Sequence, residues 1–290
     1  MNKIYDCFTF YNELDLLELR LTELYDHVDY FVISEADTTH SGQKKDLIYL
    51  DNKDRFSPWK DKIIHIEVND MPGVINDNCW HNERHQRNCL VRGLTNCDSN
   101  DVIILNDVDE MIRSSCVDFI RNDKEHNLWA FRMPFFNFRF NYMWVSPLIY
   151  QVQGQAFTVE RAKEFQNFTH IREIYGANWA NRPIEYDNGI ELCLQHSGWH
   201  FSSLGDTSFV ANKLKNFAHN EKAYQADTLD VDELIGKNKT NIMPDAKFEA
   251  VKLDDYFPTT ILENQEKYKN YIISDANKSA KDILPLYFNY

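Results

Sequence analysis

The first hundred residues alternate between two patterns of hydrophobic positions. Short runs rich in β-branched and aromatic residues are typical of strands, and longer segments with apolar residues every three or four positions are typical of helices. The predicted strands are residues 4–10, 28–34, 63–68 and 102–105, and the predicted helices are residues 14–25, capped by Asn12, and 80–94. Such alternation favours an α/β fold with a mainly parallel sheet flanked by helices.

The pattern changes near residue 128. Aromatic-rich segments such as 135–142 show partial two-residue alternation, which predicts a smaller part built from antiparallel strands. Residues 208–224 have a helical pattern, and the polar residues after about 229 are expected to pack over the body as helices and loops. We interpret 1–290 as one domain with a first half at 1–127, a second half at 128–225 and a tail at 226–290.

Charge restricts the possible ligands. The formal net charge is −14 and the pI is near 5.1, which argues against a nucleic-acid partner because phosphate backbones are bound by clustered Lys and Arg. An acidic protein that binds a diphosphate has to neutralise it locally, and a divalent cation is the usual means.

The cysteines and the apolar runs bear on the compartment. Six cysteines without a C-x-x-C pair indicate neither a zinc site nor a disulfide framework, and they are expected to be reduced and mostly buried. No signal peptide is evident, and the longest uncharged run, 140–159, contains Pro147 and Gly154 and makes a poor membrane span. We therefore expect a cytoplasmic protein without a transmembrane segment.

The clearest chemical motif is Asp107-Val108-Asp109, directly after the continuous apolar run 102–105, which is expected to form a strand buried on both faces. Ligands of open α/β sheets bind beyond the carboxyl ends of the strands. If the chain stays extended, Asp107 and Asp109 point the same way and can face one ion, or one ion and a ribose. Carboxylate oxygens suit Mn²⁺ or Mg²⁺, which in turn binds diphosphate oxygens.

Basic and imidazole side chains elsewhere could complete such a site. His200 follows Gly198, which is expected to allow a tight turn, and is a candidate third metal ligand; a structural histidine is the alternative. Its imidazole must be neutral to bind metal, so affinity is expected to fall below about pH 6.5. Lys213, Arg84 and Arg87 could contact a diphosphate, although surface lysines and surface ion pairs are common.

Two other classes of protein fit parts of this pattern. A strand followed by D-x-D also opens haloacid-dehalogenase-type phosphatases, but those motifs lie near the N-terminus and have Thr or Val where this chain has Met111. A non-catalytic carbohydrate-binding protein would retain the aromatic residues without needing both aspartates.

Several separated motifs, taken in order, resemble glycosyltransferase family 17, which includes the β-1,4-mannosyl-glycoprotein 4-β-N-acetylglucosaminyltransferases. The motifs are Phe10-Tyr11-Asn12-Glu13-Leu14-Asp15-Leu16-Leu17, Glu35, Thr39-His40-Ser41-Gly42, Glu83 with Gln86-Arg87-Asn88, Asn106-Asp107-Val108-Asp109-Glu110, Gly198-Trp199-His200-Phe201-Ser202, and Lys213 with His219 and Glu221. The resemblance extends from about residue 4 to about 225.

The resemblance implies a GT-A-type fold, UDP-GlcNAc as donor, Mn²⁺ or Mg²⁺, a glycan acceptor and inversion at the anomeric carbon. Residues 1–127 then form the nucleotide-sugar-binding half and 128–225 the acceptor-side half. Phe10, Asn12 and Glu35, which follow the first two strands, are expected to meet the uridine. Glu185 or Asp187 is our candidate for the base that deprotonates the acceptor hydroxyl.

Overall fold

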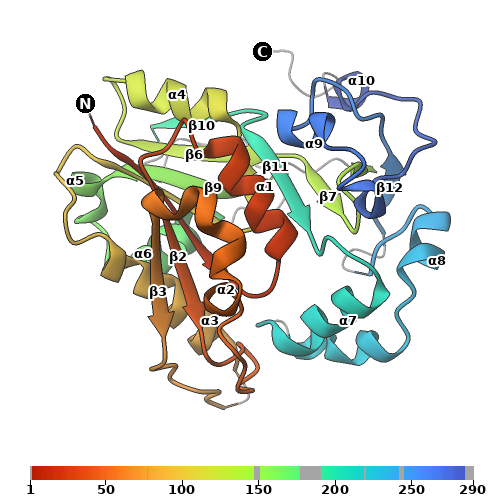
Figure 1. The fold of residues 1–290 in the computed structure, drawn as a ribbon, viewed down its shortest axis with the longest axis horizontal. Helices are drawn as coiled ribbons and strands as arrows, with labels where there is room; N and C mark the ends of the chain where they lie inside the picture. The colour runs from red at the N-terminus through yellow and green to blue at the C-terminus, as the bar shows by residue number, and fades with distance from the viewer. Residues whose placement is uncertain are drawn as a thin grey trace.

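A seven-stranded sheet and a five-stranded sheet pack side by side (Figure 1). The computed structural model describes residues 2–76, 78–146, 151–176, 191–218, 220–241 and 245–284, without the side chains of 151, 175, 176, 220 and 221. The strands are β1 (Ile4–Phe10), β2 (Tyr30–Ala36), β3 (Ile63–Val68), β4 (Val102–Asp107), β5 (Glu110–Ile112), β6 (Leu128–Met133), β7 (Phe135–Asn137), β8 (Tyr142–Ser146), β9 (Gln151–Thr158), β10 (Leu192–Leu194), β11 (Gly198–Ser202) and β12 (Lys247–Ala250).

Short and medium-length helices cover both sheets. The α-helices are α1 (Leu14–Leu24), α2 (Ile48–Asp51), α3 (Trp80–Asn88), α4 (Ser114–Asn122), α5 (Val159–Ala162), α6 (Phe168–Gly176), α7 (Thr207–Asn216), α8 (Val231–Gly236), α9 (Thr259–Glu263) and α10 (Ala280–Ile283). The 3₁₀ helices are η1 (Lys53–Lys62), η2 (Cys89–Gly93), η4 (Asn220–Asp227) and η5 (Lys269–Tyr271). Among the described helices, none combines the length and the apolar character that a membrane crossing requires.

The larger sheet has the order β10-β6-β9-β4-β1-β2-β3. Strands β3, β2, β1 and β4 are parallel neighbours, and β9 runs antiparallel between β4 and β6. In its described strands this sheet is therefore mainly parallel, as predicted, and β1 to β4 end at the same edge.

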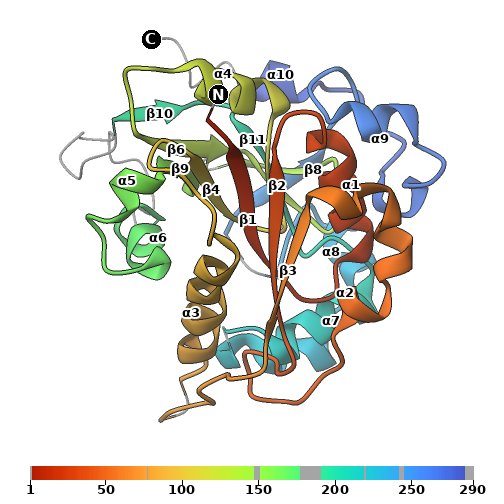
Figure 2. The ribbon, with the colours of Figure 1, turned by 60° about the vertical axis from the view of Figure 1, so that its left-hand side comes forward.

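Helices pack on both faces of this sheet, with α1 and α2 on one side and α3, α5 and α6 on the other (Figure 2). The β4 residues explain why both faces need cover. Ile104 packs in the cluster that contains α1, whereas Ile103 and Leu105 pack in the cluster that contains α6. The apolar run was predicted to be buried on both faces, and this is confirmed.

The smaller sheet, with the order β12-β8-β7-β11-β5, joins segments that are far apart in sequence. Its strand β5 follows directly after the D-x-D motif, and β11 pairs with β5 in antiparallel register. Most of the tail is helix and loop, as predicted, but β12 adds a strand by pairing with β8.

Local boundaries differ from the predictions in four places. Strand β2 starts and ends two residues later than predicted, α3 gives way to a 3₁₀ helix after Asn88, and α7 ends at Asn216 rather than extending to 224. The prediction that Asn12 caps α1 is wrong, because Glu13 occupies the N-cap position and makes no side-chain capping bond.

Candidate active site

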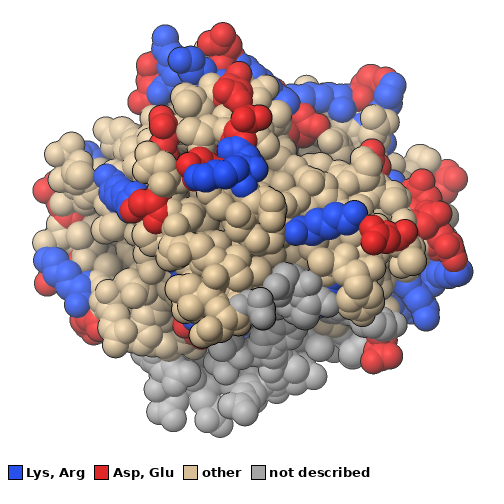
Figure 3. Space-filling view, turned by 90° about the horizontal axis from the view of Figure 1, so that it is seen from below, with Lys and Arg blue, Asp and Glu red and all other residues tan. Residues whose placement is uncertain are grey.

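A cavity of about 530 Å³ lies beyond the carboxyl ends of β1 and β4, between α3, α6, α7 and β11. Figure 3 views the molecule from the side on which these strands end. Uncharged residues cover most of the described part of that face, and charged residues lie mainly nearer its edges. The lining includes Thr9, Phe10, Tyr11, Glu13, Lys45, Trp80, Glu83, Gln86, Arg87, Asp107, Asp109, Glu110, Arg172, Glu173, His200, Lys213 and Lys222.

The D-x-D motif is a turn rather than an extended strand. Strand β4 ends at Asp107, Val108 and Asp109 form the turn, and β5 begins at Glu110. The prediction that alternate positions of a strand aim both carboxylates the same way is therefore wrong. Both aspartates nevertheless line the same cavity, because the whole turn, Val108 included, forms part of the cavity wall.

A fully buried arginine holds this turn in place. Arg20 of α1 forms a two-bond ion pair with buried Asp6 of β1, from Nε to Oδ2 at 2.7 Å and from Nη2 to Oδ1 at 2.6 Å. Its Nη1 donates to the carbonyl oxygens of Asp107 at 3.0 Å, Val108 at 3.2 Å and Glu110 at 2.8 Å. The backbone of the motif thus depends on a charge supplied by a helix almost ninety residues earlier in the sequence.

The Asp107 carboxylate lies between two guanidinium groups. Oδ1 is 2.9 Å from Nη2 of Arg87 and Oδ2 is 3.3 Å from Nη2 of Arg172, while the Thr9 hydroxyl is 3.4 Å from Oδ1. Burial alone would raise the pKa of Asp107, but the two arginines outweigh it and hold that pKa well below its usual range. Asp107 is therefore charged at neutral pH.

Glu110 is buried against the same group of charges. It accepts a hydrogen bond from the Asp107 backbone N–H at 3.0 Å and forms an ion pair with Arg172. Burial, opposed by Arg172 and reinforced by the nearby aspartates, raises the pKa of Glu110 to about 7. This carboxyl group consequently exchanges its proton near neutral pH.

Asp109 faces a second group of partners. Its Oδ2 accepts from Lys213 Nζ at 3.0 Å, and its Oδ1 lies 3.7 Å from His200 Nε2. Glu13 is 3.8 Å from the same lysine nitrogen. Burial alone would lower the pKa of Lys213, but Asp109 and Glu13 outweigh it and raise that pKa, so the ammonium keeps its charge.

His200 reaches the motif through strand pairing. In β11 it lies opposite Glu110 of β5 and beside Phe135 of β7. Gly198 allows the close approach, because a Cβ atom there would lie 2.1 Å from the Met111 carbonyl oxygen. The glycine is thus needed for close strand contact and not for the tight turn that was expected.

The protonation state of His200 is the one that a metal ligand needs. Burial, only partly offset by Asp109, lowers the pKa of His200 to about 4, so the imidazole is neutral at physiological pH. Its Nδ1 is buried and has no hydrogen-bond partner within the described part of the chain. The proton should therefore compete for this ring only well below the pH of about 6.5 expected from an unperturbed histidine.

The residues predicted to meet the uridine separate into two groups. Phe10 lines the cavity, and its carbonyl oxygen accepts from Gln86 at 3.3 Å. Glu35 is fully buried outside the lining, where it accepts from the Tyr49 backbone at 2.8 Å and contacts His65 at 3.0 Å.

Four further predicted residues lie outside the lining or outside the described structure. Asn12 is half-buried and does not line the cavity. Arg84 donates to Glu173 at 2.7 Å near the surface, so it diverges from Arg87 although both belong to α3. The candidate bases Glu185 and Asp187 lie outside the described residues.

Sequence reasoning assigned no role to several residues of this site. Glu13 and Gln86 stood in family-like motifs, and Gln86 now bridges the Phe10 carbonyl and His40. Arg172 carried no signal, because the segment around it resembles the family only loosely. Arg20 looked like any polar position of an amphipathic helix.

The side chains present fit a divalent cation. A carboxylate oxygen of Asp109 and an imidazole nitrogen of His200 converge within 3.7 Å; the oxygen suits Mn²⁺ or Mg²⁺, and the neutral imidazole could add a nitrogen ligand. Both oxygens of Asp107 face arginines, so an ion bound there would share an oxygen with a guanidinium group or displace that group.

An acidic pair and three basic side chains line a pocket at the carboxyl ends of parallel strands, which is where α/β proteins bind their ligands. The profile of Glycosyltransferase family 17 matches residues 1–246, and the chain belongs to this family. It is therefore a glycosyltransferase rather than a phosphatase or a non-catalytic carbohydrate-binding protein. The family and the sheet topology together confirm the predicted GT-A-type α/β fold.

Two of the solved structures that match this chain do so with low sequence identity and low TM-scores. A mannosyltransferase from Pyrobaculum calidifontis, PcManGT, in complex with GDP-Man and Mn²⁺ has 15% identity and a TM-score of 0.37, over 57% of this chain and 47% of its own. LgtC in complex with donor and acceptor sugar analogues has 11% identity and a TM-score of 0.36, over 92% of this chain and 94% of its own. The chain thus spans about half of PcManGT. No curated protein matches it.

Proposed function

We propose that this glycosyltransferase transfers GlcNAc from UDP-GlcNAc to a hydroxyl group of a glycan acceptor, with inversion at the anomeric carbon and with a divalent cation. The observation that carries the proposal is the convergence of Asp109, His200, Asp107 and three basic side chains in one cavity. The choice of UDP-GlcNAc rests on the resemblance to the N-acetylglucosaminyltransferases of the family.

The charge balance of the cavity supports a role for a cation. The described lining contains six acidic residues (Glu13, Glu83, Asp107, Asp109, Glu110, Glu173) and five basic ones (Lys45, Arg87, Arg172, Lys213, Lys222), a net charge between 0 and −1 with neutral histidines, depending on the protonation of Glu110. The diphosphate of a nucleotide sugar would add about two more negative charges. In a half-buried cavity this excess favours an additional positive ion.

In this proposal the basic side chains bind the diphosphate. Arg87 and Arg172 are held by Asp107 with their guanidinium groups in the cavity, and a planar guanidinium matches phosphate oxygens in two-bond geometry. Lys213 supplies a third, point-like charge from α7.

Asp109 and His200 are the proposed metal ligands, and Asp107 is the candidate third ligand once a diphosphate attracts its arginine partners. A bound Mn²⁺ or Mg²⁺ would neutralise phosphate charge and stabilise the departing UDP. His200 contributes a neutral donor, so it adds a ligand without adding to the negative charge of the cavity.

Aromatic side chains of the cavity are candidates for contacts with sugar rings. Tyr11 and Trp80 line the cavity and offer rings that can stack on sugars. Glu185 and Asp187 remain our candidates for the base that removes the proton of the attacking hydroxyl.

The test measures release of the nucleoside diphosphate, UDP or GDP, from UDP-GlcNAc, UDP-GalNAc, UDP-glucose and GDP-mannose, in EDTA and after addition of Mn²⁺. We expect UDP-GlcNAc to be turned over fastest, with activity lost in EDTA and restored by Mn²⁺. Faster turnover of another donor would refute the donor assignment, and equal turnover in EDTA would refute the metal.

Asp109→Asn is the matched variant, because it removes one charge at nearly constant volume. Glu13 still balances Lys213, so the variant should fold. Loss of a metal ligand should lower turnover by about a thousandfold. Normal melting with near wild-type turnover would place the metal elsewhere.

A further inference from the structure

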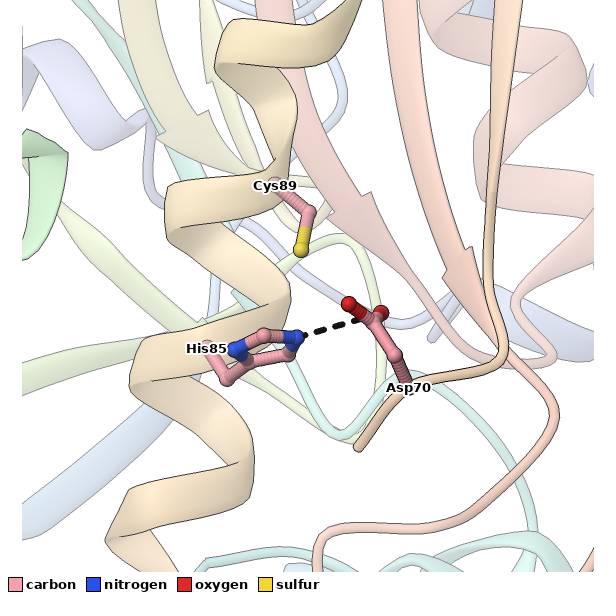
Figure 4. A group of neighbouring side chains, drawn as sticks. All are labelled: Asp70, His85 and Cys89. Atoms are coloured by element: carbon pink, nitrogen blue, oxygen red, sulfur yellow. Dashed lines mark ion pairs between the residues drawn. The ribbon is translucent and has the colours of Figure 1, made fainter. Parts of the chain in front are cut away.

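A second group of metal-binding side chains lies outside the cavity. Asp70, in the loop after β3, faces His85 and Cys89 at the end of α3 (Figure 4). One ligand atom from each residue lies within 4.8 Å of the other two. Within the described part of the chain, no other three His, Cys, Asp or Glu side chains come together this closely.

The helix explains how two of these residues meet. His85 and Cys89 are four positions apart, so they lie on one face of the helical segment and their side chains point the same way (Figure 4). Gln86 and Arg87 of the same helix line the donor cavity instead. The two faces of α3 thus serve different groups of partners.

An ion-pair contact and two hydrogen bonds orient the carboxylate toward the other two residues. In the ion pair, His85 Nε2 is 3.2 Å from Asp70 Oδ1. Arg92 donates to both carboxylate oxygens, at 3.1 and 2.6 Å, and so fixes the plane of the Asp70 carboxylate. Ligating carboxylates in metalloproteins are commonly held by such outer partners.

Exposure falls from one side of the group to the other. The side chains of Asp70 and His85 are 50% and 31% exposed, whereas Cys89 is 3% exposed. The sulfur therefore lies at the interior end, and the carboxylate and imidazole lie at an open end where a cation can enter and keep a water molecule.

We propose that Asp70, His85 and Cys89 bind a zinc ion. Zinc accepts sulfur, nitrogen and oxygen ligands in one tetrahedral site, whereas Mg²⁺ and Mn²⁺ favour oxygen-rich sites. Three protein ligands leave the fourth position to water, and the Cys89 thiol gives its proton to solvent as the Zn–S bond forms. The ion would tie the loop after β3 to the helix that carries Gln86 and Arg87 to the cavity.

Cobalt reports on this site directly, because a thiolate ligand gives Co²⁺ a charge-transfer absorption that oxygen ligands do not. Chelator-treated protein is titrated with Co²⁺ in excess Mg²⁺, which fills oxygen-ligand sites without occupying a thiolate site. We expect one equivalent of Co²⁺ to produce the thiolate band and one equivalent of Zn²⁺ to remove it.

Three variants test the assignment of the ligands. Cys89→Ser should lose the band, and Cys116→Ser, at a partly buried cysteine of α4, should retain it. Asp70→Asn changes a half-exposed side chain and should weaken Co²⁺ binding by more than about tenfold without affecting the core.

The proposal is overturned if wild-type protein shows no thiolate band, or if the band persists in Cys89→Ser. In either case, Asp70 would serve only in an ion pair with Arg92. The zinc site and the proposed transferase chemistry can be refuted independently of each other. The Asp109→Asn variant should keep the cobalt band although it no longer releases UDP.

Discussion

Arg20→Lys separates the positioning of the D-x-D turn from the stability of the fold. The wild-type Nη1 has two hydrogens shared by three carbonyl oxygens, so its contacts amount to two full hydrogen bonds. At about 1.5–3 kcal/mol for each bond from a charged group, they stabilise the turn by about 3–6 kcal/mol. The substituted ammonium stays opposite Asp6 and cannot also reach the turn, so most of this free energy should be lost.

That loss leaves a folded protein, because domains are typically stable by about 5–15 kcal/mol. The freed turn should misplace Asp109, and a displacement of about 1 Å in a reacting site costs about a hundredfold in rate. We therefore expect a raised Mn²⁺ requirement and roughly a hundredfold lower kcat/KM for UDP-GlcNAc.

The assay titrates Mn²⁺ against UDP release and records thermal unfolding of the same samples. Leu21→Ala is the matched control, since Leu21 is a fully buried neighbour on α1 and its truncation costs about 2–5 kcal/mol. The control should lower the melting temperature without moving the Mn²⁺ curve. If both variants shift that curve equally, or if Arg20→Lys leaves it unchanged, Arg20 has only a structural role.

Three further variants address separate contacts. His200→Ala should raise the Mn²⁺ concentration for half-maximal activity and be partly rescued by excess Mn²⁺, and superimposable Mn²⁺ curves for the two proteins would refute its role as a ligand. Because burial lowers the pKa of His200 to about 4, the wild-type Mn²⁺ requirement attributable to this ring should stay level from pH 8 to about pH 5.5. Arg172→Gln should raise KM for UDP-GlcNAc by about tenfold to a hundredfold with little change in Mn²⁺ requirement, and a fall in kcat alone would argue against diphosphate binding. Gly198→Ala should force β11 away from Met111, costing about 1–3 kcal/mol in thermal unfolding and displacing His200, whereas unchanged melting would contradict the close approach.

Local pattern was sufficient for the sheet that supports the site. Strands β1 and β3 have the predicted bounds, because alternation and β-branched residues are properties of neighbouring positions. The apolar run of β4 likewise predicted burial on both faces and located the acidic pair at the cavity.

Local pattern failed where burial depends on distant partners. Glu35 lies near the carboxyl end of its strand, as Phe10 does, and was expected at the ligand for that reason. His65 and the Tyr49 backbone nevertheless hold it in the interior. Arg84 and Arg87 share a helix and a residue type, but only Arg87 finds Asp107, while Arg84 pairs with Glu173 near the surface.

The sequence by itself determined the succession of strands and helices, the family and the place of the acidic pair, since each depends on residues close together in the chain or on motifs in a fixed order. Only the tertiary structure decided that Arg20 holds the turn, that Arg172 faces Asp107 and that β11 brings His200 beside Asp109. These contacts join residues from sixty-five to ninety-one positions apart. A buried charge pairs with an opposite charge that the folded chain brings near it, and the periodicity of the sequence does not indicate which residue that will be.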